Sequence, residues 1–255
     1  MPPELLLYIV CIVFLYGIVI GSFLNVCIYR IPRGESVVKA PSHCTSCGYQ
    51  LRWFDLIPIV SWLALRGHCR KCKAPISVQY PLVELANGGL YVLIFLQKGC
   101  SVESGIYCLM ASAMLVLSVI DERTFEIPAG INLFILILGV LHLAMNPADW
   151  KNYLLGAVVV SGFLALLVIF SKGRAMGGGD VKLMAGAGLL LGWQRILLAF
   201  LFGCILGAVI HTLRIKRSGA DKVLAFGPYL SVGIMLSYLW GEQMIAAYLH
   251  YLFGM

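Results

Sequence analysis

Long apolar runs dominate the pattern of this chain. An α-helix needs about 20 mostly apolar residues to cross a ~30 Å hydrocarbon layer, and runs near this length recur from one end to the other. The expected spans are 5–28, 80–97, 104–121, 130–146, 153–171, 181–193, 196–213 and 226–251. The pattern therefore predicts an all-α polytopic membrane protein with about eight transmembrane helices.

Charge supports this number of crossings. The span 181–193 is short, about 20 Å at ~1.5 Å per residue, so it is either re-entrant or thins the bilayer locally. With the N-terminus outside, the inner loops hold sixteen of the 19 Lys and Arg residues, and the outer loops hold three. Basic residues favour the inner side of a membrane. Without the short span, Arg214 and Lys216 would lie outside, so eight crossings are favoured.

Composition excludes an ordinary soluble domain. The chain is 60% hydrophobic and 12% charged, whereas soluble chains are about 45–50% apolar and about 25% charged. The net charge of +7 fits membrane topology better than nucleic-acid binding, because the basic residues lack an interleaved aromatic platform. Residues 1–28 carry too long an apolar run for a signal peptide and are expected to be the first membrane helix.

Residues 29–79 form the one long loop, expected on the cytosolic side, and carry four cysteines. Cys44 and Cys47 form one Cys-x-x-Cys pair, and Cys69 and Cys72 form another. The two pairs are separated by 21 residues. Four thiolates suit tetrahedral zinc, and a closed four-cysteine site indicates a structural metal. A redox pair and an iron–sulfur centre are the alternatives. The loop is expected to be a small zinc-knuckle subdomain, with no internal repeat visible in its sequence.

Acidic residues in membrane helices are costly and are functional candidates. Asp121 and Asp180 are expected at the inner ends of two helices, at one membrane depth. Two close carboxyl groups do not ionise together easily, so one can act as a base while the other donates a hydrogen bond. Gly177, Gly178 and Gly179 precede Asp180, and they let an extended substrate approach; the alternative is a tight turn with Asp180 as the helix N-cap.

The expected helix directions bias the shared proton. Asp121 is expected at a helix C-terminus, whose carbonyl groups disfavour an anion. Asp180 is expected at a helix N-terminus, whose N–H groups favour one. On this ground the proton is expected on Asp121, and the resting base is expected to be Asp180, with Lys182 close by in sequence.

Several ordered motifs resemble the type IV prepilin peptidase family, over nearly the whole chain. They are Gly-Ser-Phe-Leu-Asn-Val at 21–26, Tyr-Arg-Ile-Pro at 29–32, Ile-Pro-Ile-Val-Ser-Trp at 57–62, Arg-Gly-His-Cys-Arg-Lys-Cys at 66–72, Tyr-Pro-Leu-Val-Glu at 80–84, Ile-Asp at 120–121 with Ile-Pro at 127–128, Gly-Gly-Gly-Asp-Val-Lys-Leu at 177–183 and Phe-Gly-Pro-Tyr at 226–229. Two positions depart from the family pattern: Gln79, where Arg is frequent, and Ala129, where an acid or amide is frequent.

The resemblance implies a bacterial inner-membrane enzyme with a cytosolic catalytic face. It would cleave the basic leader of prepilins and pseudopilins after a glycine, with Asp121 and Asp180 as its catalytic pair. It also implies N-methylation of the new terminus by S-adenosylmethionine, attributed to residues 29–79, with residues 80–255 as the peptidase bundle. Further contacts with substrate or cofactor are expected at Gly177, Gly178, Gly179, Lys182, Glu84, Glu122 and Glu126.

Two other classes of function remain open from the residues alone. An ion-coupled transporter would use Glu84, Asp121 and Asp180 as an ion path, although transporters tend to show inverted repeats and acids at the midplane. A non-enzymatic zinc-loop scaffold of a secretion system would explain the cysteines but not the acids.

Overall fold

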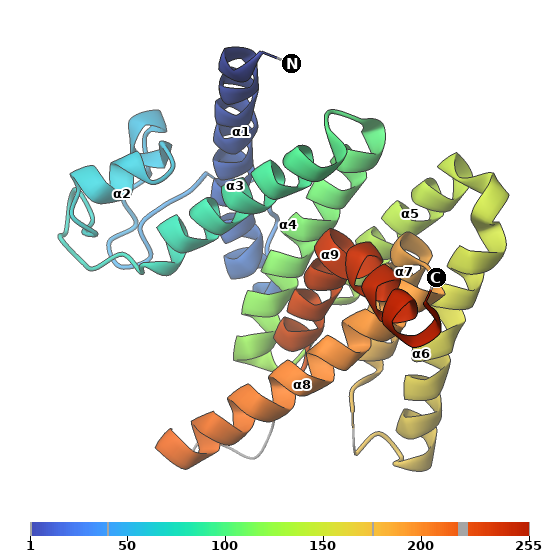
Figure 1. Cartoon of the computed structure of the whole chain (residues 1–255). Helices are drawn as coiled ribbons and strands as arrows, with labels where there is room; N and C mark the ends of the chain where they lie inside the picture. Colours follow the sequence, from blue (N-terminus) through green and yellow to red (C-terminus); the bar gives the residue numbers. More distant parts are fainter. Residues whose placement is uncertain (1, 40, 175, 219–223, 255) are drawn as a thin grey trace. The chain divides into compact units, whose positions relative to one another are not determined.

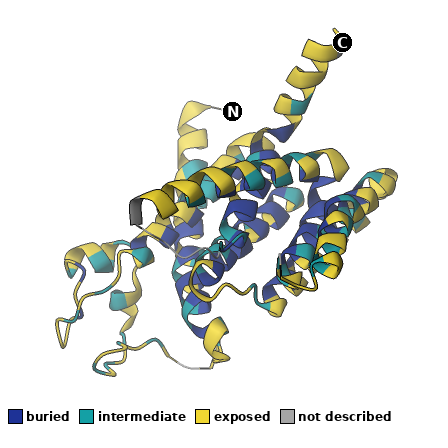
Figure 2. Cartoon of the chain, turned by 90° about the horizontal axis from the view of Figure 1, so that it is seen from below, coloured by how far each residue is buried: buried dark blue, intermediate teal, exposed yellow. Residues whose placement is uncertain are grey.

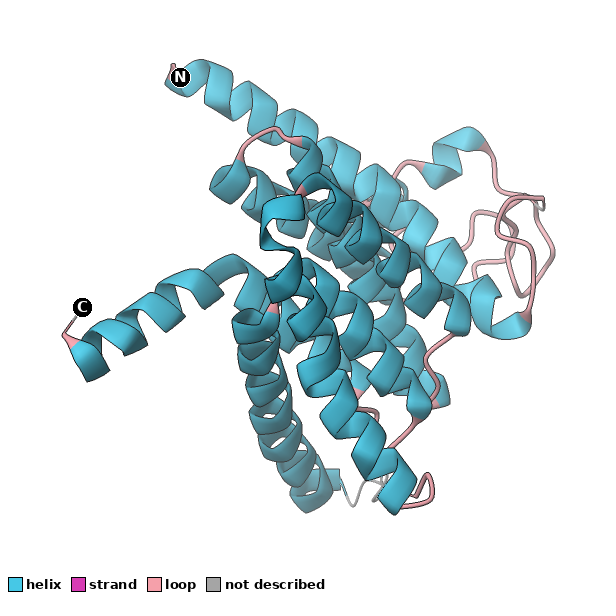
Figure 3. Ribbon diagram, turned by 90° about the vertical axis from the view of Figure 1, so that its right-hand side faces the viewer, coloured by secondary structure: helices cyan, strands magenta, loops and turns pink. Residues whose placement is uncertain are grey.

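The computed structural model of the chain consists of helices joined by loops (Figure 3). It describes residues 2–39, 41–174, 176–218 and 224–254. Within these ranges there is no β-strand, and the two isolated β-bridges both lie in the cysteine loop. The all-α prediction is confirmed.

Each of the expected spans is occupied by a long helix (Figure 1). These helices are α1 (Pro3–Arg30), α3 (Gln79–Lys98), α4 (Val102–Thr124), α5 (Ala129–Met145), α6 (Trp150–Phe170), α7 (Gly178–Leu191), α8 (Trp193–Ser218) and α9 (Gly227–Phe253). In the described ranges, four of them are long and apolar enough to cross a membrane unaided: α1, α4, α6 and α8. Eight crossings, and the orientation of the N-terminus, remain predictions.

Short helices in the loops were not anticipated from the sequence. They are η1 (Ile31–Arg33), η2 (Trp53–Leu56), α2 (Val60–Ala64) and η3 (Pro147–Asp149). Two of them, η2 and α2, lie between the cysteine pairs. The cysteine loop therefore has helical structure of its own.

The chain divides into two compact units, residues 1–116 and residues 117–255, and the division falls within α4. In the first unit, α1 packs along α3. A Cβ atom on Gly17 would lie 2.7 Å from the Cα atom of Gly88, so the two backbones are in direct contact. Small residues permit such close helix packing in membranes. The amide of Asn87 reinforces it by donating to the Gly17 carbonyl at 2.7 Å.

In the second unit, α7 is the most enclosed helix and packs against α5, α6 and α8. Leu183, Met184 and Leu190 have no exposed surface. A Cβ atom on Gly188 would lie 2.2 Å from the Gly156 carbonyl oxygen, so α7 also touches the α6 backbone. By contrast, the first turns of α1 and the last turns of α9 are largely exposed (Figure 2). The enclosed α7 carries Asp180 in its first turn.

Candidate functional site

Asp121 lies in the last turn of α4 and is 4% exposed. Its Oδ2 atom accepts a hydrogen bond from the backbone N–H of Gly227, at 2.8 Å. Gly227 is the first residue of α9, and N–H groups at a helix start have no partner within the helix. The start of α9 therefore offers Asp121 both a donor and a partial positive charge.

No side chain fits at Gly227. A Cβ atom there would lie 2.7 Å from Oδ2 of Asp121 and 2.9 Å from a methyl carbon of Leu117. Glycine is required at this position because there is no room for a Cβ atom. Its backbone conformation is that of an ordinary helix start and does not itself require glycine. The sequence contained a hint of this role, the Phe-Gly-Pro-Tyr motif at 226–229, but not the contact with Asp121.

Asp180 is the third residue of α7 and is 9% exposed. The negative charge of Asp121 acts on this carboxyl group, so the two buried carboxyl groups of the second unit interact electrostatically. Among the described residues, no side chain or N–H group donates a hydrogen bond to the Asp180 carboxyl. The N-cap of α7 is Gly177 rather than Asp180, so Asp180 does not serve as the cap.

The three glycines before Asp180 have different surroundings. A Cβ atom on Gly178 would meet no atom within 4 Å, and one on Gly177 would meet only the Gly179 nitrogen, at 3.9 Å. Both residues are exposed, which leaves room for an extended chain beside them. Gly179 is packed instead, because its Cβ position lies 3.0 Å from Cβ of Ile127.

A polar contact that the sequence did not predict holds the same glycine. The side-chain amide of Asn132, in the first turns of α5, donates to the Gly179 carbonyl oxygen at 3.1 Å. Asn132 is 4% exposed. A single Asn in an apolar helix carries no distinguishing sequence signal, so only the fold reveals it.

The predicted charged residues around the pair are all exposed. Glu122 forms an ion pair with Arg214 of α8. Neither Glu126 nor Lys182 has an ion-pair partner among the described residues. Binding of a substrate by these three side chains remains a prediction.

Glu84 anchors the cysteine loop within the first unit. It is 5% exposed, and its Oε2 atom accepts the Ile59 N–H at 2.7 Å. Ile59 has φ 62° and ψ −53°, a rare conformation for a β-branched residue. The Glu84 carboxylate is therefore engaged in holding a strained turn, and its predicted role toward substrate or cofactor remains untested.

The two cysteine pairs adopt the same backbone structure. Cys44 N–H donates to the Tyr49 carbonyl at 2.8 Å, and Cys69 N–H donates to the Ala74 carbonyl at 2.8 Å. The β-bridge His43–Gln50 likewise repeats as His68–Pro75. The loop thus contains a repeated backbone knuckle that was not anticipated from the sequence. Beyond the His-Cys-x-x-Cys pattern at 43–47 and 68–72, the two copies share few side chains.

The four sulfur atoms converge as the sequence predicted. The Sγ atoms of Cys44, Cys47, Cys69 and Cys72 all lie within 4.8 Å of one another, and those of Cys44 and Cys72 are 3.9 Å apart. Tetrahedral zinc with Zn–S bonds of ~2.3 Å needs S···S distances of about 3.8 Å. Backbone N–H groups of Cys72 and Lys71 lower the pKa of the Cys69 thiol to about 6. These residues fit a structural zinc ion.

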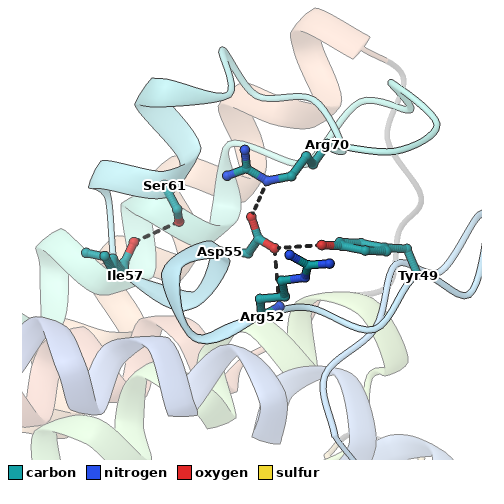
Figure 4. A network of polar contacts seen from close by, with 6 residues as sticks. All are labelled: Tyr49, Arg52, Asp55, Ile57, Ser61 and Arg70. Atoms are coloured by element: carbon teal, nitrogen blue, oxygen red, sulfur yellow. Dashed lines mark hydrogen bonds and ion pairs between the residues drawn. The ribbon is translucent and has the colours of Figure 1, made fainter.

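Asp55 ties the two knuckles together (Figure 4). Its carboxylate accepts hydrogen bonds from Nε of Arg70 at 2.7 Å, from the Arg52 N–H at 3.2 Å and from the Tyr49 hydroxyl at 3.3 Å. Burial opposes ionisation of Asp55, yet these donors and the Arg70 charge hold its pKa below the ordinary value. Since Tyr49 belongs to one knuckle and Arg70 to the other, the Asp55 contacts fix their relative position.

Comparison with known proteins places both units in one family. Residues 15–98 match the Bacterial Peptidase A24 N-terminal domain, and residues 108–212 match the Type IV leader peptidase family. The chain is 35% identical to a prepilin leader peptidase/N-methyltransferase of Stutzerimonas stutzeri, covering 96% of this chain and 95% of that protein. It is 32% identical to the protein of the same name from Bacillus subtilis, covering 95% and 99%. No solved structure matches.

The repeated knuckle predicts opposite effects of two matched substitutions. Gly48 and Lys73 occupy equivalent left-handed positions, with φ 68° and 59°. That conformation costs an L-residue about 1–2 kcal/mol, while a glycine costs about 0.4–1 kcal/mol more in the unfolded chain. Gly48→Ala, which meets no atom within 4 Å, should speed zinc loss to a chelator, whereas Lys73→Gly should leave it unchanged or slow it.

Elemental analysis of the purified protein sets the baseline for that comparison. We expect one zinc ion per chain. Absence of zinc together with four reactive thiols in the loop would contradict the metal site, and faster loss from Lys73→Gly than from Gly48→Ala would contradict the equivalence of the knuckles.

Proposed function

Because the chain belongs to the type IV leader peptidase family, we propose that it is a membrane aspartic endopeptidase that removes the basic leader of prepilins and pseudopilins. The observation that carries this proposal is the burial of two carboxyl groups, Asp121 and Asp180, at helix ends of one unit. The apolar helices and the family indicate an inner-membrane protein. Cleavage at the cytosolic face, with the N-terminus outside, is part of the proposal.

Other functions have less support. An ion-coupled transporter would need acids along a path through the membrane, but Asp121 lies in the last turn of α4 and Asp180 in the first turn of α7. A zinc-loop scaffold would leave two buried, paired carboxyl groups without a purpose, at the cost that such burial carries.

In the proposed hydrolysis of the peptide bond, the two carboxyl groups have different roles. The ionised carboxylate takes a proton from a water molecule, whose oxygen attacks the carbonyl carbon of the scissile bond. The protonated carboxyl donates a hydrogen bond to the carbonyl oxygen as negative charge develops there. Collapse of the tetrahedral intermediate breaks the C–N bond, and the new amine receives a proton from the pair.

The Gly227 hydrogen bond favours Asp121 as the ionised member. A hydrogen bond to a charged group contributes about 1.5–3 kcal/mol, whereas a helix-end dipole contributes about 0.3–1 kcal/mol, and up to about 2 kcal/mol in partly buried geometries. At Asp121 the carbonyl end of α4 disfavours an anion and the start of α9 favours one, so these two dipoles oppose each other. The Gly227 hydrogen bond then favours an anion on Asp121, and the dipole of α7 favours one on Asp180. The larger effect reverses the assignment expected from helix directions, so we assign the resting base to Asp121 and the shared proton to Asp180.

Substrate binding is proposed at the open glycines and the exposed acids. Gly177 and Gly178 leave space for the extended chain around the scissile bond. Glu126 is exposed without an ion-pair partner among the described residues, so it can meet a basic leader directly. Glu122 would first have to exchange its partner Arg214.

N-methylation of the new terminus by S-adenosylmethionine is also proposed, because the relatives are named prepilin leader peptidase/N-methyltransferase. The methyl donor would supply an electrophilic methyl group to the free amine. Asp55 of the loop and Glu84 of α3 already accept hydrogen bonds from Arg70 and Ile59. The zinc knuckles and Glu84 are proposed to keep this loop folded.

Replacing either aspartate by Asn should abolish cleavage. Loss of a general acid or base costs about 10²–10⁴-fold in rate, so Asp121→Asn and Asp180→Asn should each leave a prepilin-type peptide in detergent intact. The exposed Asp149 provides a matched control, since Asp149→Asn should cleave normally. Mass spectrometry of the peptide reports cleavage and the added methyl group together. Substantial cleavage by a single variant would remove that aspartate from the mechanism.

A methyl group at Gly227 should disturb Asp121 without unfolding the protein. Gly227→Ala places a carbon 2.7 Å from Oδ2, and small displacements in a catalytic site cost up to about 10²-fold in rate. The control is Gly130→Ala, whose Cβ meets no atom within 4 Å.

Infrared spectra with residue-specific isotope labels should assign the protonated carboxyl of the unsubstituted enzyme to Asp180. Full activity of Gly227→Ala, or a protonated band from Asp121, would contradict the assignment.

Glu126→Gln should raise KM for a basic leader at low salt. Exposed ion pairs contribute about 0.2–1 kcal/mol, so the expected increase is at most about fivefold. The effect should shrink at high salt, where exposed charges are screened. A peptide whose leader lysines are replaced by glutamine should be insensitive, and Glu4→Gln serves as the enzyme control. An unchanged KM at low salt would refute the contact.

A further inference from the structure

Asn132 and Ile127 hold the backbone immediately before Asp180, and Asn132 lies outside the motifs. Asn132 of α5 donates its side-chain amide to the Gly179 carbonyl oxygen at 3.1 Å. A Cβ atom on Gly179 would lie only 3.0 Å from Cβ of Ile127. Gly179 is therefore fixed both by a hydrogen bond and by packing.

Fixing the Gly179 carbonyl orients the following residue. A peptide bond is planar, so the carbonyl of Gly179 and the nitrogen and Cα of Asp180 move as one plate. Rotation of that plate would swing the Asp180 side chain relative to Asp121, with which it is electrostatically paired. Within α7 the Gly179 carbonyl also accepts the N–H four residues further on, whereas the Asp180 N–H lies among the helix-start donors that have no partner within the helix. The Asn132 bond is therefore a second restraint on a plate that the helix itself holds from one side.

Asn132 is not explained by packing stability. The side chain is 4% exposed, and its neighbours in the sequence of α5 include the buried Ile131 and Ile135. The Oδ1 atom is buried and has no hydrogen-bond partner among the described residues. A buried polar atom without a partner destabilises a fold, so an apolar residue would suit this position better if it served the core alone.

We propose that Asn132 is a positioning residue for cleavage, which sets the orientation of the Asp180 carboxyl by holding the Gly179 carbonyl. The inference rests on the proposed function, since it assigns Asn132 a role in the reaction of the aspartate pair. Asn132 acts through the backbone and has no contact with the substrate in this scheme. Its loss therefore lowers kcat and leaves KM nearly unchanged.

The decisive variant is Asn132→Asp, which keeps the shape of the side chain. An ionised carboxylate cannot donate to the Gly179 carbonyl, whereas a protonated carboxyl can. At about pH 8 we expect kcat to fall by about 10–100-fold. The ratio of variant to unsubstituted kcat should then rise about tenfold by about pH 5.5, as the donor returns. Asn132→Ala should lose a similar factor in kcat and show no recovery.

A matched control is available in the first unit. Asn87 is fully buried and also donates its amide to a glycine carbonyl, that of Gly17, at 2.7 Å. Asn87→Asp introduces the same chemical change into helix packing of the first unit, whereas the two aspartates belong to the second. Its ratio of kcat to that of the unsubstituted enzyme should not depend on pH. Melting temperatures of all variants in detergent separate folding from catalysis.

The outcomes distinguish this inference from the proposed function. Equal kcat of Asn132→Ala and the unsubstituted enzyme would overturn the positioning role, because alanine supplies no donor. So would a loss of kcat in Asn132→Asp that is the same at both pH values, because a packing defect does not depend on protonation. Cleavage by Asp180→Asn would instead overturn the aspartate mechanism itself. Inactive Asp180→Asn together with a pH-independent Asn132→Asp would overturn only the inference about Asn132.

Discussion

The cost of burying two carboxyl groups near one another constrains the second unit of this protein. Each acid must lose water, and together they repel if both ionise. The fold compensates with backbone rather than with basic side chains: the start of α9 donates to Asp121, and Asp180 lies in the first turn of α7. A basic partner would hold both acids ionised, whereas backbone donors leave one proton to be shared. This arrangement supports acid–base chemistry.

Glycine enables that arrangement through space rather than through unusual backbone angles. Gly227 allows α9 to reach Asp121, and Gly188 allows α7 to lie against the α6 backbone. Gly179 accommodates Ile127 and presents its carbonyl to Asn132. Each glycine permits an approach for which a Cβ atom leaves no room. At Gly227 and Gly179 this brings a polar backbone group to a side chain, and at Gly188 it brings two helix backbones together. Gly177 and Gly178 differ, because they face open space.

The first unit solves a different physical problem. A loop of residues 29–79 buries little apolar surface of its own, and small folds of this size need cross-links. Four convergent thiols, the Asp55 network and the Glu84 bond to Ile59 supply them. The strained Ile59 conformation is maintained by a buried carboxylate on α3, so the loop is tied to the helix that follows it. Knuckles and anchor together give the loop one defined structure.

The sequence by itself determined the helices, the cysteine set and the two aspartates as candidates. Apolar run length and residue type are local properties, so all eight expected spans were found as helices. Among the residues that the structure describes, four of these helices have the length and composition of a membrane crossing. Only tertiary structure decided the partners. Asp121 and Gly227 are far apart in the chain, as are Asn132 and Gly179. In each hydrogen bond, one partner is a backbone group that every residue possesses. A contact made by such a group leaves no mark in the residue pattern, and so the sequence could name the acids but not what holds and polarises them.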